Sequence, residues 1–180
     1  MSYLVTGGAG FIGAHVVAQL SRAGHQVTSY DLHLDSAFLK QVAPTGVTYV
    51  QGDILDLSRL LAAAQQSNVH TLIHLASPLS TVTEDNPWLA VNTMCLGHIN
   101  ILETAKQLGL RKVVWASSVA VFGPPDCYPK GQVDDDSPHY PATLYGACKS
   151  LNERLGRHYR ERFGLESVGL RYPVVYGPGR

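Results

Sequence analysis

The chain has 180 residues, with 14 basic and 14 acidic side chains and a formal net charge of zero. Hydrophobic residues make up 45% of it and charged residues 16%, which is typical of a globular domain with a buried core. The balanced charge excludes the electrostatic footprint of a protein that binds nucleic acid or an anionic membrane. No apolar run is long enough for a membrane span, and no signal peptide is visible at the N-terminus.

In chain order, apolar β-rich runs alternate with helical patterns. The alternation predicts an α/β fold in which helices cover both faces of a parallel sheet. Right-handed crossovers then give a doubly wound, Rossmann-type sheet with strand order 3-2-1-4-5-6. The predicted elements are strand Tyr3–Val5, helix Phe11–Ala23, strand Gln26–Tyr30, a short helix near Ser36–Val42, strand Val47–Val50, helix Ser58–Gln66, strand Val69–Leu75, helix Pro87–Leu108, strand Lys112–Ala116, helix Leu144–Phe163 and strand Glu166–Leu170. The irregular stretch Gly123–Thr143 is long enough to be either a functional loop or a mobile surface loop.

The first predicted strand runs into a glycine-rich turn, Thr6–Gly13, that opens a helix. Glycines in such a turn, here Gly7, Gly10 and Gly13, let the backbone approach a dinucleotide pyrophosphate. The helix then begins with Phe11 and Ile12 and presents unpaired N–H groups and the positive end of its dipole to the anion. The alternative is a strand-to-helix turn that needs its glycines only for steric reasons.

Two aspartates follow the second and third predicted strands. Asp31 lies about 20 residues beyond the turn, where a carboxylate accepts hydrogen bonds from ribose hydroxyls and repels a 2′-phosphate. It therefore favours NAD over NADP, although a solvated strand-end carboxylate is the alternative. Asp53, followed by Ile54, is placed to bond the adenine amino group, but it is equally suited to cap a helix or a turn.

Tyr145 and Lys149 are four residues apart on a predicted helix and so share one face. An ammonium group beside a phenol stabilises the phenolate, so we expect Lys149 to lower the pKa of Tyr145 and make it a proton acceptor or donor. Ser118 follows the fifth predicted strand, at the sheet edge where α/β proteins bind ligands, and could hold the substrate oxygen. These three residues predict a catalytic site.

The cysteines and histidines show no metal-site pattern. Cys95, Cys127 and Cys148 are odd in number and widely spaced, so they predict neither a metal nor a disulfide framework. They favour a reducing, cytoplasmic setting. The histidines are not spaced as ligands either, and we expect them on the surface or at strand ends: His15, His25, His70, His74, His98, His139 and His158.

Several motifs occur together: Thr6–Gly13, Gly52–Ile54, His74–Ala76, Val91-Asn92 with Gly97 and Asn100, Ala116–Gly123, Tyr145–Lys149 and Leu170–Gly179. As a set they resemble the extended short-chain dehydrogenase/reductase superfamily, in its NAD-dependent epimerase/dehydratase branch. The resemblance covers essentially the whole chain. It implies NAD as the cofactor, no metal, and further cofactor contacts from Leu75, Ala76, Ser77, Asn92, Ser117, Tyr145, Lys149, Pro173 and Val175.

The departures from the family pattern narrow this expectation. Val119 and Ala120 replace the Asp-Glu pair of sugar-nucleotide dehydratases and cannot move protons, so dehydration is disfavoured. Val174 replaces an asparagine that is common in sugar epimerases. Ser77 follows the His74-Leu75-Ala76 motif, as a serine does in some reductases of the superfamily. Cys148 replaces a common serine, and we interpret it as a small packing residue and not as a catalytic nucleophile.

Members of the family are much longer than this chain, and their further residues build most of the substrate pocket. Residues 1–180 are therefore expected to form an NAD-binding Rossmann domain that keeps the site geometry, with the substrate-binding region largely absent. In related enzymes the helices matching Pro87–Leu108 and Leu144–Phe163 form a four-helix bundle, which implies a homodimer.

The leading hypothesis is an NAD-dependent oxidoreductase or epimerase that acts on a secondary alcohol, in a sugar or nucleotide sugar. Two alternatives remain open. One is a non-catalytic NAD-binding module or an inactive fragment of such an enzyme. The other is an NAD(P)-dependent ketone or aldehyde reductase of the same superfamily.

Overall fold

The computed structural model describes residues 1–34, 37–42, 46–129 and 132–178. Three residues lie outside the described ranges: Ser36 of the predicted short helix, Gly179 at the end of the last motif, and Arg180. The strands are β1 (Ser2–Thr6), β2 (Gln26–Asp31), β3 (Val47–Gln51), β4 (Thr71–His74), β5 (Lys112–Ser118) and β6 (Glu166–Tyr172). The longer helices are α1 (Phe11–Arg22), α2 (Ala37–Val42), α3 (Leu57–Gln66), α6 (Gly97–Gln107) and α7 (Leu144–Phe163).

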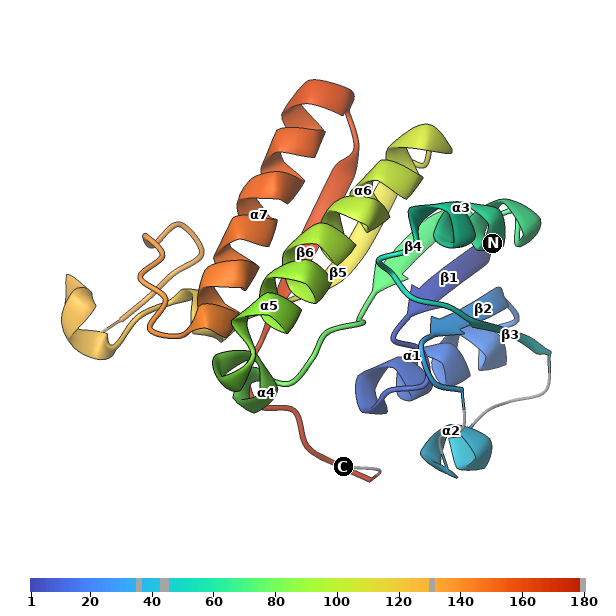
Figure 1. Ribbon diagram of the computed structural model, residues 1–180, viewed down its shortest axis with the longest axis horizontal. Coiled ribbons are helices and arrows are strands. Elements are labelled where there is room, and N and C mark those ends of the chain that lie inside the picture. The colour runs from blue at the N-terminus through green and yellow to red at the C-terminus, as the bar shows by residue number, and fades with distance from the viewer. Residues whose placement is uncertain (35–36, 43–45, 130–131, 179–180) are drawn as a thin grey trace.

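The six strands form one parallel sheet in the order β3-β2-β1-β4-β5-β6 (Figure 1). This is the predicted Rossmann order, and the doubly wound fold class is confirmed. Because all strands run the same way, their carboxyl ends meet at one edge: Thr6 pairs with Tyr30 and His74, and Ser118 pairs with Tyr172. Every predicted site residue on a strand lies at or just beyond this edge.

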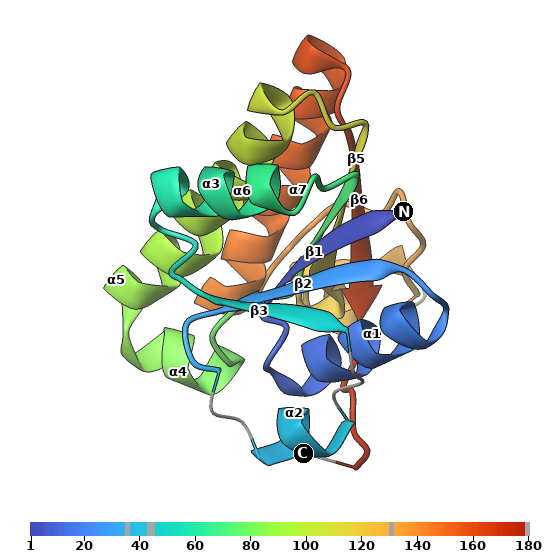
Figure 2. The same ribbon diagram turned by 90° about the vertical axis from the view of Figure 1, so that its right-hand side faces the viewer.

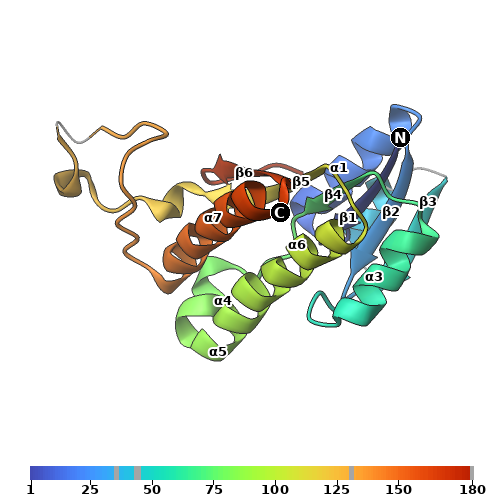
Figure 3. The same ribbon diagram turned by 90° about the horizontal axis from the view of Figure 1, so that it is seen from above.

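Helices cover the two faces unequally (Figure 3). On one face α3, α6 and α7 pack on the main core, in which Leu4, Leu72 and Trp115 are buried. On the other face α1 covers β1 and β2. The side chains of Val168 and Leu170 on β6 are 39% and 41% exposed, because α1 does not extend over that strand.

The predicted helix Pro87–Leu108 is divided. It consists of α5 (Pro87–Leu89), a π-helical segment (Ala90–Leu96) and α6. A π-helical turn is wider than an α-helical turn and changes which side chains face inward. Here Ala90, Met94 and Cys95 are buried, and they form a small cluster with Cys148 of α7. The helix α4 (Ser80–Asp85) was not predicted, because its short polar sequence has no helical apolar pattern.

Candidate active site

The glycine turn crosses directly over the end of β4. Gly7 has a φ of +70°, and a Cβ there would lie 2.5 Å from the Ala76 nitrogen. A Cβ at Gly13 would lie 1.9 Å from the Gly7 oxygen. Both glycines are therefore required for packing, as the steric alternative proposed.

The first turn of α1 is open toward the sheet edge. Gly10 is its N-cap residue in an extended conformation, and no side chain caps the helix. The first turn also contains no acidic residue. Unpaired N–H groups at a helix start attract an anion, so this turn, with Phe11 and Ile12, can hold a phosphate group.

Asp31 ends β2 beside the glycine turn. Its Oδ2 accepts a hydrogen bond from the Ala9 nitrogen at 2.9 Å, and its Oδ1 accepts one from the His33 nitrogen at 3.2 Å. The carboxylate is thus fixed against the turn and remains partly exposed. This position suits the ribose contact expected from the sequence.

Asp53 and Ile54 serve local structure with their side chains. The Asp53 carboxylate accepts a hydrogen bond from the Leu55 nitrogen at 2.9 Å, which is the turn role weighed as the alternative. Ile54 belongs to the main core and is 5% exposed. Asn100 of α6 donates to the carbonyl oxygens of Ile54 and Leu55, at 2.9 and 3.2 Å. The Asp53 side chain is nevertheless exposed, and only its Oδ1 takes part in the turn, so its contact with a cofactor stays a prediction.

Leu75 and Ala76 continue β4 beneath the glycine turn, and the Leu75 nitrogen donates to the Thr6 oxygen at 2.9 Å. Asn92 lies in the π-helical segment and donates to the Trp88 carbonyl at 2.8 Å. Its amide therefore has a structural role within its own helix. A cofactor role for these three residues stays a prediction.

The three predicted catalytic residues come together at the sheet edge. The Tyr145 hydroxyl hydrogen-bonds with the hydroxyls of Ser118 and Ser77. Ser118 Oγ also accepts from the Ala120 nitrogen at 3.1 Å, which fixes its rotamer. Ser77 was expected only as a cofactor contact, since nothing in its sequence position indicates that it reaches Tyr145.

The predicted effect of Lys149 on Tyr145 is wrong in this structure. Burial raises the pKa of Tyr145 above its ordinary value, although the hydrogen bonds from Ser77 and Ser118 lower it in part. The Lys149 ammonium lies 5.4 Å from the centre of the Tyr145 ring and donates to the Ala116 carbonyl at 2.7 Å. Burial lowers the pKa of Lys149 itself to about 8. Desolvation therefore outweighs the attraction that the spacing suggested.

Ser117 points away from the predicted cofactor side. Because successive side chains alternate across a strand, Ser117 and Ser118 face opposite ways. Ser117 Oγ donates to Glu153 of α7 at 2.6 Å, and Glu153 forms a two-pronged ion pair with Arg171 of β6. Any contact of Ser117 with a cofactor must use its backbone.

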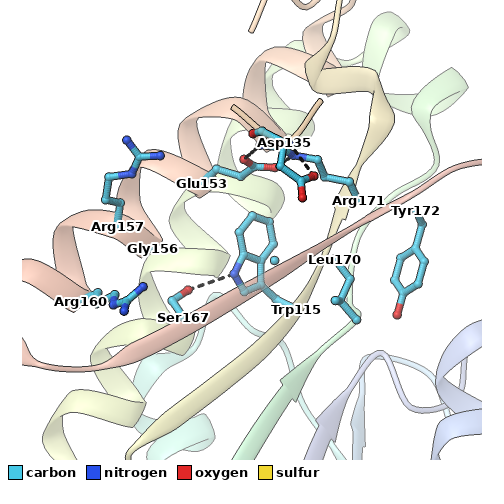
Figure 4. Close-up of a pocket in the computed structure, with 11 residues that line it drawn as sticks. Trp115, Asp135, Glu153, Gly156, Arg157, Arg160, Ser167, Leu170, Arg171 and Tyr172 are labelled. Carbon is cyan, nitrogen blue, oxygen red and sulfur yellow. Dashed lines mark hydrogen bonds and ion pairs between the residues drawn. The ribbon is translucent and has the colours of Figure 1, made fainter. Parts of the chain in front are cut away.

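Glu153 and Arg171 also line a hollow of about 650 Å³ beside the free edge of β6 (Figure 4). Trp115 lies at its base and donates to Ser167 at 3.0 Å. Arg157 of α7 also lines the hollow. This hollow was not predicted from the sequence. It is lined by β6 and the middle of α7, whereas Tyr145 and Lys149 lie near the start of α7 and Ser118 lies at the end of β5.

The segment after β6 returns toward α1 (Figure 2). A Cβ at Gly177 would lie 3.7 Å from the Phe11 ring, and the Pro178 oxygen lies 3.3 Å from His15 Nε2. The segment containing Pro173 and Val175 thus runs from the catalytic edge to the start of α1. Its two predicted cofactor contacts stay predictions.

Two roles could not be found from the sequence. Glu84 of α4 accepts hydrogen bonds from the Leu144 and Tyr145 nitrogens, at 3.3 and 3.1 Å, and so caps α7. His98, expected at the surface, is fully buried, with its ring 4.6 Å from that of Trp115 and 5.5 Å from that of His74. Both arrangements join residues far apart in the chain, so no local spacing indicates them.

No helix among the described residues has the length and apolar character needed to cross a bilayer. The side chains of the same residues contain no group of three or more potential metal ligands. The site is therefore built from backbone amides, hydroxyls, one lysine and one aspartate. That composition suits a dinucleotide and an alcohol.

A parallel sheet of this order, with a glycine turn at the start of α1, defines a dinucleotide-binding α/β protein. Residues 3–180 match the NAD dependent epimerase/dehydratase family. The chain belongs to this family, as its motifs indicated.

Relatives and solved structures agree with the family assignment. UDP-glucuronate 4-epimerase 2 of Arabidopsis thaliana is 35% identical over an alignment of 187 positions, which covers 99% of this chain and 43% of that protein. The structure of the Thermus thermophilus UDP-glucose 4-epimerase in complex with NAD has a TM-score of 0.89 and 33% identity, over 99% of this chain and 57% of that one. L-threonine dehydrogenase of Clostridium difficile has a TM-score of 0.86 and 31% identity, over 99% and 56%. The chain spans about half the length of these proteins.

Proposed function

We propose that this chain is the NAD-binding part of an enzyme that acts on a secondary alcohol of a nucleotide sugar. The observation that carries the proposal is the meeting of the Tyr145, Ser118 and Ser77 hydroxyls at the sheet edge that also holds the glycine turn. The epimerase relatives, whose names specify UDP-sugars, support the substrate class.

The residues at this edge fit NAD. The uncapped start of α1 would receive the pyrophosphate, and Asp31 would accept hydrogen bonds from the ribose hydroxyls. A carboxylate at this place repels a 2′-phosphate, which favours NAD over NADP. When bound, NAD supplies the acceptor and the donor of the hydride.

The protein's own residues would bind the substrate oxygen and transfer its proton. Ser118 would hold the substrate oxygen, and Tyr145 would take up and return the proton of the substrate hydroxyl. The raised pKa of Tyr145 keeps the phenol protonated at neutral pH. Proton uptake would therefore depend on the hydrogen bonds from Ser77 and Ser118, which lower the pKa of Tyr145.

A dehydrogenase is the second candidate. The likeness to L-threonine dehydrogenase is nearly as close as that to the epimerases, and Val174 stands where sugar epimerases often have asparagine. A dehydrogenase or reductase changes the redox state of the cofactor in each turnover, whereas an epimerase leaves it unchanged. Following cofactor absorbance with UDP-sugars, with L-threonine and with ketones separates these reactions.

The catalytic assignment is tested with Tyr145→Phe and Ser118→Ala, in this chain and in a version extended at its C-terminus. We expect both variants to bind NAD and to lose turnover, by about 100-fold or more. Tight NAD binding without turnover by any unsubstituted version would instead favour a non-catalytic binding module.

Asp31→Asn tests the cofactor site. Asparagine keeps a hydrogen-bond acceptor for Ala9 but loses the charge, so we expect NAD affinity to fall about tenfold, since a hydrogen bond to a charged group contributes about 1.5–3 kcal/mol. Discrimination against NADP should fall as well. Titration calorimetry measures both.

Asp56→Asn is the matched control, because Asp56 is exposed, caps α3 and is not among the predicted cofactor contacts. NAD affinity should be unchanged in this variant. Equal losses from both substitutions would contradict the assignment of the ribose contact to Asp31.

We also propose that the chain forms a homodimer through α7 and the helices before it. Large apolar side chains lie exposed there, with Trp88 72%, Val91 50% and Leu151 48% accessible. A helix pair from a second copy would cover them as a four-helix bundle. Sedimentation should show a dimer, and a Leu151→Glu variant should sediment as a monomer; a wild-type monomer at high concentration would reject the proposal.

A cytoplasmic setting is inferred from the thiols. Cys127 is free and exposed, and Cys95 and Cys148 are free and buried. Exposed free thiols persist in reducing compartments. Fractionation of the source cells tests this inference.

A further inference from the structure

Cys95 and Cys148 are adjacent in space although they are far apart in the chain. Cys95 lies on the π-helical segment and Cys148 on α7, and both belong to the buried cluster that also contains Ala90 and Met94. The two thiols hydrogen-bond with each other. They are 6% and 3% exposed, so each thiol's surroundings are almost entirely protein.

The cluster adjoins the proposed catalytic turn. Tyr145 packs against it, and Cys148 directly precedes Lys149 in the chain. A change in the position of Cys148 is therefore transmitted to the backbone of one helical turn that carries both Tyr145 and Lys149.

We propose that Cys95 and Cys148 form a reversible disulfide when the protein meets a peroxide, and that this bond joins the π-helical segment covalently to α7. One sulfur attacks hydrogen peroxide, the O–O bond breaks, and a sulfenic acid and one water form. The second sulfur then displaces the hydroxyl of the sulfenic acid, the S–S bond forms, and a second water leaves. Two thiols have been oxidised and one peroxide reduced.

The surroundings of the thiols decide how this reaction proceeds. Burial and, to a lesser extent, the neighbouring Cys148 raise the pKa of Cys95 to about 12, and Lys149 opposes them in part. Thiolates are the reactive form, so attack is slow while the cluster is closed. Once one sulfur is oxidised, its partner is already adjacent, so the second step is fast and a single sulfenic acid does not persist.

The bond would also displace the catalytic turn. A disulfide holds its sulfurs about 2.05 Å apart, closer than any hydrogen-bonded pair. The π-helical segment and α7 must therefore approach each other at Cys148. This consequence rests on the proposed function: crosslinked protein should show a smaller rise in melting temperature with NAD than reduced protein does.

The experiment uses hydrogen peroxide and a Cys127→Ser background, which removes the exposed thiol. After peroxide treatment and denaturation, we expect both remaining thiols to be lost to a thiol-specific reagent and the mass to fall by two hydrogen atoms. A non-reducing peptide digest should contain one crosslinked species joining the Cys95 and Cys148 peptides. Dithiothreitol should restore both thiols.

Cys95→Ala and Cys148→Ala are the matched controls in the same background. Each should lose the crosslink and instead gain oxygen atoms on its remaining sulfur. Two results would overturn the proposal. In the first, both thiols of the Cys127→Ser protein stay titratable under conditions that oxidise Cys127 of the wild-type chain. In the second, both sulfurs gain oxygen without forming a crosslink. The mass result stands even if the reduced protein does not bind NAD, so failure of the proposed function is distinguished from failure of the disulfide.

Discussion

Gly7 combines two requirements at one position. Its φ of +70° is costly for any residue with a Cβ, and the end of β4 lies directly against it. The same close contact brings the turn to the strand that carries Leu75 and Ala76. Packing demands glycine here, so the residue alone is not evidence for a ligand, and the open start of α1 supplies that evidence.

Gly7→Ala should lower the free energy of unfolding by more than backbone strain alone would lower it. Gly109→Ala is the matched control, because Gly109 has a similar φ of +63° and no atom within 4 Å of its would-be Cβ. We expect about 1–2 kcal/mol of lost stability at Gly109 and at least about 2 kcal/mol more at Gly7, since the added clash is with backbone. Urea denaturation measures both, and equal losses would show that the turn can move away from β4.

Helix α7 owes its position to contacts at both of its ends. Thr143 Oγ1 accepts from the Gly146 nitrogen at 3.0 Å, Glu84 accepts from two further nitrogens of the first turn, and Gly164 ends the helix with a φ of +68°. The negative charge of Glu84 also faces the positive end of the helix dipole. Since Tyr145 lies in this first turn, α4 contributes to the placement of the catalytic hydroxyl.

Glu84→Ala removes this cap, and we expect a stability loss of about 1–2 kcal/mol, because two helix N–H groups lose a charged acceptor. The neighbouring exposed Asp85→Ala is the control and should change stability by less than about 0.5 kcal/mol. Thermal unfolding compares the two. If α7 does not depend on α4, the two variants will melt alike.

The core between the sheet and the α6–α7 layer contains two histidines. His74 ends β4 and its Nδ1 lies 2.8 Å from the Thr6 hydroxyl, while His98 of α6 lies between His74 and Trp115. Burial lowers the pKa of His74 to about 3 and that of His98 well below its ordinary value of 6.5, and the charge of Lys149 contributes to both shifts. Both rings are therefore neutral in the folded protein near pH 7.

This arrangement predicts acid sensitivity. Above pH 6.5 both histidines are neutral in the folded and unfolded states and add no pH dependence. As pH falls below 6.5 the unfolded chain binds protons that the folded chain cannot, so the free energy of unfolding falls by up to about 1.4 kcal/mol per pH unit for each histidine.

His98→Leu should reduce this slope, measured by urea unfolding between neutral pH and about pH 5, because one of the two buried bases is gone. His33→Leu, at an exposed position, should leave the slope unchanged. Parallel pH profiles for wild type and His98→Leu would mean that His98 becomes protonated without unfolding.

The sequence by itself determined the sheet order, the glycine turn and the pairing of Tyr145 with Lys149. These features are encoded locally: apolar periodicity defines strands and helices, and a four-residue spacing fixes one helix face. The same local reasoning placed Ser118 at the carboxyl end of the sheet, although β5 extends two residues beyond its predicted end and includes Ser118. It also indicated that Asp31 lies at the end of the second strand, where the structure has it.

Only the tertiary structure decided what these residues do to one another. The sign of the Tyr145 pKa shift depends on burial, which the spacing of Tyr145 and Lys149 does not contain. The Ser117 side chain bonds Glu153, and one carboxylate oxygen of Asp53 accepts a hydrogen bond within a turn. The contacts of Ser77 with Tyr145, of Glu84 with α7, and of Cys95 with Cys148 join distant segments. A sequence records which groups are present, whereas desolvation and distance arise only when the folded chain brings them together.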